Sequence, residues 1–285
     1  MKKLTIILPA RNEAKGLRAL LPEILARMPN AEVIIVNDGS TDDTADICRQ
    51  YGTKLVMHPY GMGNGAAVKS GARVAQGEIL VFMDADGQHQ PQDISHLLEK
   101  LAQGYDMVVG ARSRRSQAGM HRAVANGLYN RLASWMVGQR VGDLTSGFRA
   151  VKADKFRKFL YMLPNGFSYP TTITMSFFRA GYAVGYVPIH APKRIGNSHM
   201  RIVRDGVRFL LIIFKIGSLY SPLKLFFPIS MFFFLLGCGN YLYTFLTIHR
   251  FTNMSALLFI TSMIVFLIGL VSEQITMLAY RDSEH

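Results

Sequence analysis

The feature that most constrains this chain is a pair of long apolar segments towards its C-terminal end. Residues 223–248 are almost continuously apolar, and a second apolar run covers about 256–270 and continues as a mixed helix to Tyr280. Each segment can supply the roughly 20 residues that a helix needs to cross about 30 Å of hydrocarbon. No third apolar segment is present to cover a buried helical pair. We therefore expect two transmembrane helices over residues 223–285.

Positive charges flank both outer sides of this pair. Arg201, Arg204 and Arg208 recur at helical spacing among apolar residues, so residues 201–222 are expected to form an amphipathic juxtamembrane helix in the membrane interface. A solvated charge stripe on an ordinary helix is the alternative. The link between the spans carries only Arg250. By the positive-inside rule, both ends of the hairpin and the large preceding domain lie in the cytoplasm.

The composition agrees with a protein that works at a membrane. The net charge is +13, while 49% of residues are hydrophobic and only 18% are charged. This balance indicates anionic partners and a membrane surface, and no groove-reading module supports nucleic acid as a partner. Cys48 and Cys238 have neither disulfide nor zinc spacing, which is typical of a reducing compartment. A two-span hairpin buries little surface by itself, so it could pack against further copies of the chain in a homo-oligomer.

The N-terminal part alternates strand-like and helix-like stretches. Strands are expected at 4–8, 32–37, 54–57, 79–83 and 107–110, and helices at 13–28, 41–51, 64–75 and 91–103, with Ser40 as a candidate cap of the second helix. This alternation predicts an α/β domain over residues 1–200, with a mostly parallel sheet and helices on both faces. Ligands bind at the carboxyl ends of such strands, where Pro9, Asp38 and Asp84 fall.

A group of oxygen ligands follows the apolar run 78–83. Asp84, Asp86 and Gln88 occupy alternate positions, and in extended backbone such side chains point to one side. Two carboxylates and an amide suit Mg²⁺ or Mn²⁺, which takes further ligands from water and substrate phosphates. A polar strand-to-helix turn with Asp as a cap is the alternative.

Four motifs in order carry a family resemblance. They are Pro9-Ala-Arg-Asn-Glu13, Val36-Asn-Asp-Gly-Ser-Thr-Asp42, Asp84-Ala-Asp-Gly-Gln-His89 and Thr145-Ser-Gly-Phe-Arg-Ala150. Together they resemble the family 2 glycosyltransferases of the Rossmann-like GT-A fold. More narrowly, the chain is similar to the polyprenyl-phosphate glycosyltransferases, such as dolichol-phosphate mannose synthase. The resemblance covers about residues 4–200, and the hairpin matches the two-span members.

The resemblance implies a donor site at the first three motifs. Pro9, Ala10, Arg11, Glu13 and Val36 would line the nucleotide pocket, and Asp38 would accept hydrogen bonds from the base. Asp84 would contact nucleotide and metal, with Asp86 and Gln88 as direct metal ligands. Arg194 would meet the donor diphosphate in a loop where His199 replaces the family's usual Lys, so His199 or Arg201 would supply the second contact. Gly61-Met-Gly-Asn-Gly65 resembles a phosphate cradle without being a P-loop, and Lys69 is a weaker candidate contact.

The resemblance also implies an acceptor site. Arg122 matches by motif spacing a family arginine that meets the lipid phosphate, and Ser146 belongs to the fourth motif. Arg112, at the exit of the fifth strand, can reach the cleft. Guanidinium groups suit phosphate because they present a fixed fork of donors. Arg122 opens an amphipathic segment with an apolar side at Leu128, Leu132, Trp135 and Met136, whereas Arg149 is expected to be structural.

The implied reaction is inverting transfer of a sugar from GDP-mannose or a UDP-hexose to undecaprenyl or dolichyl phosphate. Asp86, Arg112 and Arg122 would act by positioning and electrostatics, and no catalytic base is assigned because a phosphate acceptor is already ionised. Two alternative functions differ in the acceptor or in catalysis. A polysaccharide synthase of the same fold would carry Gln-x-x-Arg-Trp, which is absent around the single Trp135. A non-catalytic nucleotide-binding membrane scaffold is the other, and the intact acidic motifs argue against it.

Overall fold

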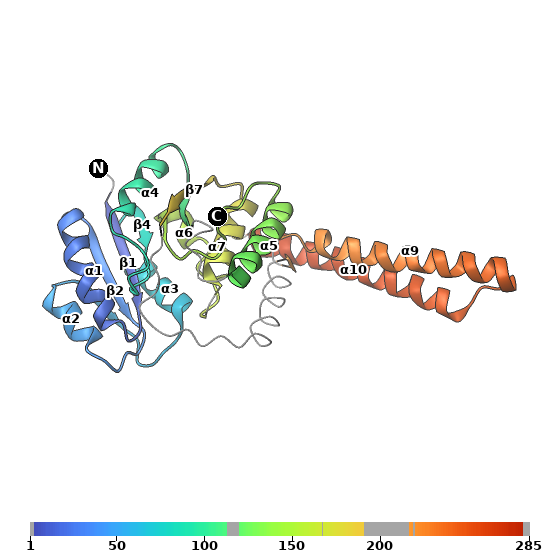
Figure 1. Cartoon of the computed structure of the whole chain (residues 1–285), viewed down its shortest axis with the longest axis horizontal. Helices are drawn as coiled ribbons and strands as arrows, with labels where there is room; N and C mark the ends of the chain where they lie inside the picture. The colour runs from blue at the N-terminus through green and yellow to red at the C-terminus, as the bar shows by residue number, and fades with distance from the viewer. Residues whose placement is uncertain (1–2, 113–119, 167, 191–216, 219, 282–285) are drawn as a thin grey trace. The chain divides into compact units, whose positions relative to one another are not determined.

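The computed structural model describes residues 3–112, 120–166, 168–190, 217–218 and 220–281. The chain divides into two compact units, Met1–Met200 and Arg201–His285. The first unit contains an α/β sheet domain and the second contains the C-terminal helices (Figure 1). The expected interface helix over 201–222 falls largely outside the described residues.

The first unit is built on a seven-stranded sheet in the order β3-β2-β1-β4-β6-β5-β7. All neighbours pair in parallel except β6, which runs antiparallel between β4 and β5. The strands are β1 (Leu4–Ala10), β2 (Glu32–Asn37), β3 (Lys54–Met57), β4 (Ile79–Phe82), β5 (Met107–Arg112), β6 (Arg149–Lys152) and β7 (Val184–Ile189). The helices are α1 (Ala14–Arg27), α2 (Thr44–Gln50), α3 (Asn64–Val74), α4 (Asp93–Ala102), α5 (Met120–Val137), α6 (Ala153–Arg157) and α7 (Tyr169–Arg179).

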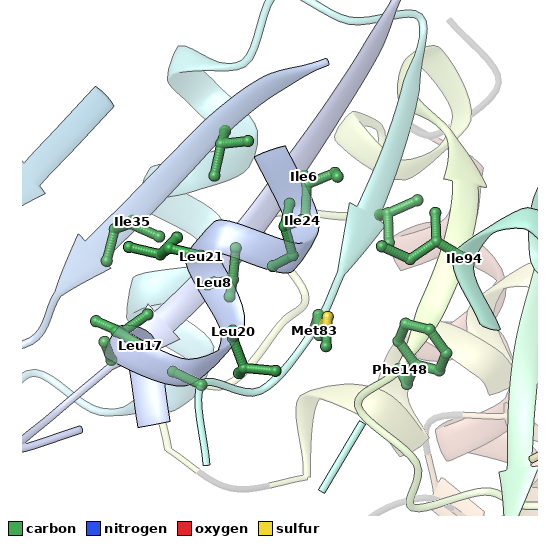
Figure 2. Packing of buried hydrophobic residues seen from close by; sticks show 14 of the residues in the cluster. Ile6, Leu8, Leu17, Leu20, Leu21, Ile24, Ile35, Met83, Ile94 and Phe148 are labelled. Carbon is green, nitrogen blue, oxygen red and sulfur yellow. The ribbon is translucent and has the colours of Figure 1, made fainter. Parts of the chain in front are cut away.

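Helices cover both faces of the sheet because its buried strands are apolar on both sides. On one face, Leu17, Leu21 and Ile24 of α1 pack against Ile6 and Leu8 of β1 (Figure 2). On the other face, α3 approaches so closely that a Cβ on Gly71 would lie 2.4 Å from Ile7 Cγ2. The same face buries an aromatic group in which the rings of Phe82 and Phe156 lie 4.6 Å apart.

The mostly parallel sheet and the expected α/β class are confirmed. β6 and β7 were not among the predicted strands, and the expectation that Ser40 caps the second helix is wrong. That helix begins at Thr44, after Asp43, and Ser40 Oγ instead accepts a hydrogen bond from Asn12 N at 3.0 Å. Asp42 connects the two helix starts, since its carboxylate accepts from Thr44 N at 3.1 Å and from Ala14 N at 3.2 Å.

The second unit contains the expected hairpin, with α9 (Pro222–Ile248) packed along α10 (Asn253–Arg281) (Figure 1). Both helices are long and apolar enough to cross a membrane. Polar contacts hold them in register: Ser230 Oγ donates to Ser262 O at 3.0 Å, and Ser255 Oγ donates to Asn240 Oδ1 at 2.9 Å. Glu273 accepts from Leu223 N at 3.2 Å, so it caps the first turn of α9.

Candidate active site

The carboxyl ends of β1, β2 and β4 meet at one edge of the sheet. Pro9 is paired with Val36, Asp38 N donates to Ala10 O at 2.9 Å, and Met83 N donates to Ile7 O at 3.1 Å. The turns that follow these three strands therefore start side by side, as expected from the alternation of strands and helices. Val36 and Ala10 are buried, whereas Arg11 is exposed and Glu13 is half-buried.

The Asp84–Gln88 turn leaves β4 with its polar side chains partly exposed. Asp86 Oδ1 accepts from Gln88 N at 3.1 Å, and Gly87 has φ +76°, a conformation that favours glycine. The turn is supported from below by α1, since a Cβ on Gly16 would lie 2.0 Å from Ala85 O. Close packing against α1 therefore fixes the backbone that carries both aspartates.

The donor set of this turn fits a hard divalent cation. Asp84, Asp86 and Gln88 each offer side-chain oxygen acceptors, which Mg²⁺ and Mn²⁺ prefer. Among the described residues no group of three or more His, Cys, Asp or Glu could hold a metal ion. Two carboxylates and an amide form an incomplete shell, the kind that Mg²⁺ completes with waters and substrate phosphates.

The fourth motif lies directly against Asp84. A Cβ placed on Gly147 would lie 3.0 Å from Asp84 Oδ2 and 3.3 Å from Oδ1, so only glycine leaves this carboxylate its space. His89 also contacts Asp84: Asp84 N donates to His89 Nδ1 at 3.3 Å, and the His89 ring stacks on Phe148 with ring centroids 5.0 Å apart. Burial lowers the pKa of His89 to about 4, so the ring is neutral and accepts at Nδ1.

Arg112 is held by a carboxylate that sequence reasoning missed. Its Nε and Nη2 donate to the two oxygens of Asp143 at 2.8 and 3.1 Å, and Nη2 also donates to Thr145 Oγ1 at 2.6 Å. Burial by itself would raise the pKa of Asp143, but the Arg112 guanidinium outweighs it and the pKa is lowered. Asp143 stands two residues before the fourth motif, and this proximity is the signal that could have found it.

Ser146 and Arg149 of the fourth motif are buried. Ser146 Oγ has no hydrogen-bond partner among the described residues, and the residue is 1% exposed. Arg149 is completely buried; it donates to the carbonyl oxygen of Ser146, and its Nη1 donates to Pro170 O and Thr174 Oγ1 at 3.1 Å each. These contacts, to two main-chain carbonyls and one threonine hydroxyl, agree with the expected structural role of Arg149.

Asp38 organises the glycine-rich turn at the exit of β3. Its carboxylate accepts from Met62 N at 2.7 Å, from Gly63 N at 2.8 Å and from His58 Nδ1 at 2.8 Å. Burial would raise the pKa of Asp38, but these three hydrogen bonds outweigh it and the pKa is lowered. His58, whose Nε2 lies 2.9 Å from Ser70 Oγ, was not identified from the sequence.

The Gly61–Gly65 turn lies against the first motif. A Cβ on Gly61 would lie 2.5 Å from Arg11 Nη1, so the guanidinium lies directly on the turn. The amide groups that begin α3 are already used: Gly65 N donates to Gly166 O at 3.2 Å and Ala66 N donates to Asn165 O at 2.9 Å. Lys69 Nζ donates to Leu163 O at 3.0 Å. This helix start is bound to a protein loop instead of forming a phosphate cradle.

The side chains of some predicted site residues lie outside the described part of the structure. Arg122 lies in α5, but its side chain is outside the described residues. Arg194, His199 and Arg201 lie wholly outside them. An apolar cavity lined by Leu4, Ile79 and Leu98 opens at the other end of the sheet, at the amino ends of β1 and β4, where ligands of such sheets do not bind.

Comparison with known proteins decides the family. Residues 5–160 match the family model described as Glycosyl transferase family 2, which covers more than half of the chain. The chain belongs to glycosyl transferase family 2. Residues 221–278 of this glycosyltransferase match a second model, described as GtrB C-terminal hairpin. This second match coincides with α9 and α10.

Three relatives illustrate what this glycosyltransferase is similar to. Glycosyltransferase AglJ of Haloferax volcanii is 27% identical over 84% of this chain and 80% of the relative. An undecaprenyl-phosphate mannosyltransferase of Micrococcus luteus is 31% identical over 70% of this chain and 88% of the relative. An undecaprenyl-phosphate 4-deoxy-4-formamido-L-arabinose transferase of Aeromonas hydrophila is 33% identical over 53% of this chain, which spans about half (49%) of that relative.

Solved structures show the fold. Glucosyl-3-phosphoglycerate synthase from Mycobacterium tuberculosis, in complex with Mn²⁺, UDP and glucosyl-3-phosphoglycerate, superposes with a TM-score of 0.60 at 20% identity. The match covers 76% of this chain and 79% of the other. The sheet domain of this glycosyltransferase therefore has the GT-A fold.

Proposed function

We propose that this glycosyltransferase moves a sugar from a nucleotide-sugar, GDP-mannose or a UDP-hexose, to the phosphate of a membrane polyprenol, undecaprenyl or dolichyl phosphate. The observation that carries the proposal is the combination, in one chain, of the Asp84–Gln88 turn at the sheet edge and a hairpin of the GtrB type. The names of the bacterial relatives support the lipid acceptor, since both include undecaprenyl phosphate.

The donor would lie along the exits of β1, β2 and β4. The exposed side chain of Arg11 lies against the glycine-rich turn and is suited to bind a phosphate or a base. The pocket would be framed by Pro9, Ala10, Glu13 and Val36. Asp38 would act on the nucleotide largely through the turn that it holds, because its side chain is buried. Arg194 would close on the diphosphate. Mg²⁺ or Mn²⁺, held by Asp84, Asp86 and Gln88, would offset charge on the leaving nucleoside diphosphate.

The acceptor phosphate would be held by Arg112, Arg122 and Ser146. Asp143 fixes the guanidinium of Arg112 and so limits its freedom before the acceptor arrives. A lipid monophosphate is ionised at neutral pH, so its oxygen attacks the anomeric carbon without a general base. Attack opposite the leaving diphosphate inverts the anomeric centre. The protein then contributes position and electrostatic stabilisation.

The cleft would face the cytoplasm, where nucleotide-sugars are made. The arginines that precede the hairpin and the single Arg250 between the spans support this orientation through the positive-inside rule. The hairpin would make the enzyme an integral protein of the inner or plasma membrane. The hairpin would also keep the catalytic domain close to the headgroups, where the acceptor phosphate lies.

A donor panel tests the proposal. The full chain in liposomes that contain a polyprenyl phosphate is incubated with UDP- and GDP-sugars, and lipid products are detected by mass spectrometry. We expect one donor class to give a polyprenyl-phosphate sugar, and the Asp86→Asn variant to give far less. Sugar transfer that proceeds equally well in liposomes without polyprenyl phosphate would contradict the proposal.

A further inference from the structure

His58 is the centre of a chain of buried polar contacts that ends at Asp38. Its side chain is only 6% exposed. The ring Nδ1 donates to Asp38 Oδ1 at 2.8 Å, and Nε2 lies 2.9 Å from Ser70 Oγ. Because a carboxylate only accepts, Nδ1 carries the proton, and the neutral ring then accepts at Nε2 from the Ser70 hydroxyl. Both nitrogens of the ring are therefore used inside the protein.

The backbone on both sides of this ring is fixed. His58 N donates to Asn37 O at 2.9 Å, so the ring starts beside the residue that precedes Asp38. Ser70 lies in α3, and this helix packs against β1 so closely that its Gly71 leaves no space for a Cβ beside Ile7. A ring held between a strand end and a closely packed helix has little freedom, so it gives the Asp38 carboxylate a rigid support.

Asp38 passes this support to the glycine-rich turn. Its Oδ1 accepts from Met62 N at 2.7 Å, and its Oδ2 accepts from Gly63 N at 2.8 Å. With His58 also bound to Oδ1, the carboxylate cannot turn without breaking at least one of the three hydrogen bonds. The exposed guanidinium of Arg11 lies directly on the same turn. The position of this cation therefore depends on His58 through two successive contacts.

The order Asp38, His58, Ser70 is also that of a serine-hydrolase triad. Such an enzyme needs amide donors beside its serine to bind the oxyanion. Ser70 lies within α3, more than one turn from its start at Asn64, where backbone amides are used by the helix itself. The contacts of His58 therefore serve to hold Asp38, and they do not make Ser70 a nucleophile.

We propose that His58 is a positioning residue for the nucleotide-sugar donor, which it serves by fixing Asp38 and, through Asp38, the turn that carries Arg11. The inference rests on the proposed function, in which this turn and the strand exits bind the donor. It implies a selective defect. Loss of His58 weakens donor binding and spares the acceptor, because Arg112, proposed for the acceptor phosphate, is held by Asp143 instead.

Three variants separate the two ends of the ring. In His58→Asn the side-chain amide takes the place of Nδ1 and keeps the hydrogen bond to Asp38. In His58→Gln the longer side chain brings its amide to the place of Nε2, near Ser70, and leaves Asp38 without this donor. Ser70→Ala removes only the far contact of the ring.

Binding of the matching nucleoside diphosphate to the full chain is measured by calorimetry, and KM and kcat are measured in liposomes with polyprenyl phosphate. In His58→Gln, the Kd of the nucleotide and the KM of the donor should rise about tenfold, the worth of one hydrogen bond to a charged group. In His58→Asn and Ser70→Ala the rise should be about threefold, and kcat and the KM of the acceptor should stay within about twofold of the parent in all three.

His96 supplies the matched control, because its Nδ1 lies 3.6 Å from an Asp93 oxygen while its side chain is 60% exposed. His96→Gln should equal the parent in every constant. Equal donor affinity in His58→Gln and His58→Asn would overturn the proposal, and so would a fall in kcat or acceptor affinity as large as the fall in donor affinity. If His58→Gln does not fold, Ser70→Ala decides, since donor affinity equal to the parent's would refute the support. A parent chain that binds no nucleoside diphosphate would instead refute the proposed function, and this inference with it.

Discussion

Replacing Asp143 by asparagine removes the only carboxylate seen to bind the Arg112 guanidinium among the described residues. Both Asp143 oxygens accept from that guanidinium, and the Asp143 side chain is 2% exposed against 26% for Arg112. The change keeps the size of the side chain but leaves a largely buried cation without its counter-charge. We expect a loss of stability from this uncompensated charge.

The magnitude follows from the burial of the pair. Removing one partner of a buried ion pair costs about 3–5 kcal/mol, and the partial exposure of Arg112 favours the lower end, about 3 kcal/mol. For a domain of this size, each kcal/mol lowers the melting temperature by about 2–4 °C, so the expected fall is about 6–12 °C. An Arg112→Gln change added to Asp143→Asn should recover part of this loss, because the unpaired charge is removed.

Thermal unfolding of the full chain, followed by Trp135 fluorescence, measures this effect on the sheet domain. Asp46→Asn is the matched control, because Asp46 pairs with Arg49 while the two side chains are 74% and 64% exposed. Exposed pairs contribute at most about 1 kcal/mol. If Asp143→Asn lowers the melting temperature no more than Asp46→Asn does, the structural role of the Arg112–Asp143 pair is refuted.

Three further changes test other contacts. Gly147→Ala should displace the Asp84 carboxylate by a few tenths of an ångström and reduce turnover by about tenfold or less at unchanged stability; Gly166→Ala, with no atom within 4 Å of the added Cβ, should be silent in the same assay. Asp86→Asn should cost about 3 kcal/mol of transition-state stabilisation, roughly a hundredfold in rate. It should also abolish the Mn²⁺ dependence of nucleotide binding measured by calorimetry, and an unchanged dependence would exclude Asp86 as a metal ligand. Burial would raise the pKa of Asp106, but hydrogen bonds from two lysines and a backbone amide lower it. Its stabilisation is therefore complete above the unfolded pKa and lost as pH falls through the lowered folded pKa, so the stability difference between Asp106→Asn and the parent should shrink in acid denaturant titrations.

The core of the fold could be predicted because its signals are local. Each of the first strands is a short run of branched apolar residues, and the alternation with helices suffices to predict a parallel sheet. β6 gave no such signal, since Arg149–Lys152 is four residues long and has a charged residue at each end. Its strand conformation depends on β4 and β5, which lie far away in the sequence and bind it on both sides.

In the candidate site, too, local features could be predicted from the sequence and long-range contacts could not. The Asp84–Gln88 turn could be found because its predicted metal ligands alternate over five residues. Arg112 could be found as a strand-exit residue, but its partner Asp143 lies 31 residues later in the sequence. The two side chains meet because β6, which follows Asp143, pairs with β5. The hydrogen bonds of Asp38 with Met62, Gly63 and His58 likewise depend on the pairing of β3 with β2, which brings the residues after β3 beside the end of β2. Contacts of this kind need the tertiary structure.

The most direct test of the proposed function is a count of phosphorus in the products. With the full chain in liposomes, an active donor and polyprenyl phosphate, mass spectrometry identifies both the lipid product and the released nucleotide. Attack of the lipid phosphate on the anomeric carbon predicts one phosphorus atom in the glycolipid and one nucleoside diphosphate released for each sugar transferred. A glycolipid with two phosphorus atoms and release of nucleoside monophosphate would contradict the account, because the chain would then transfer a sugar phosphate.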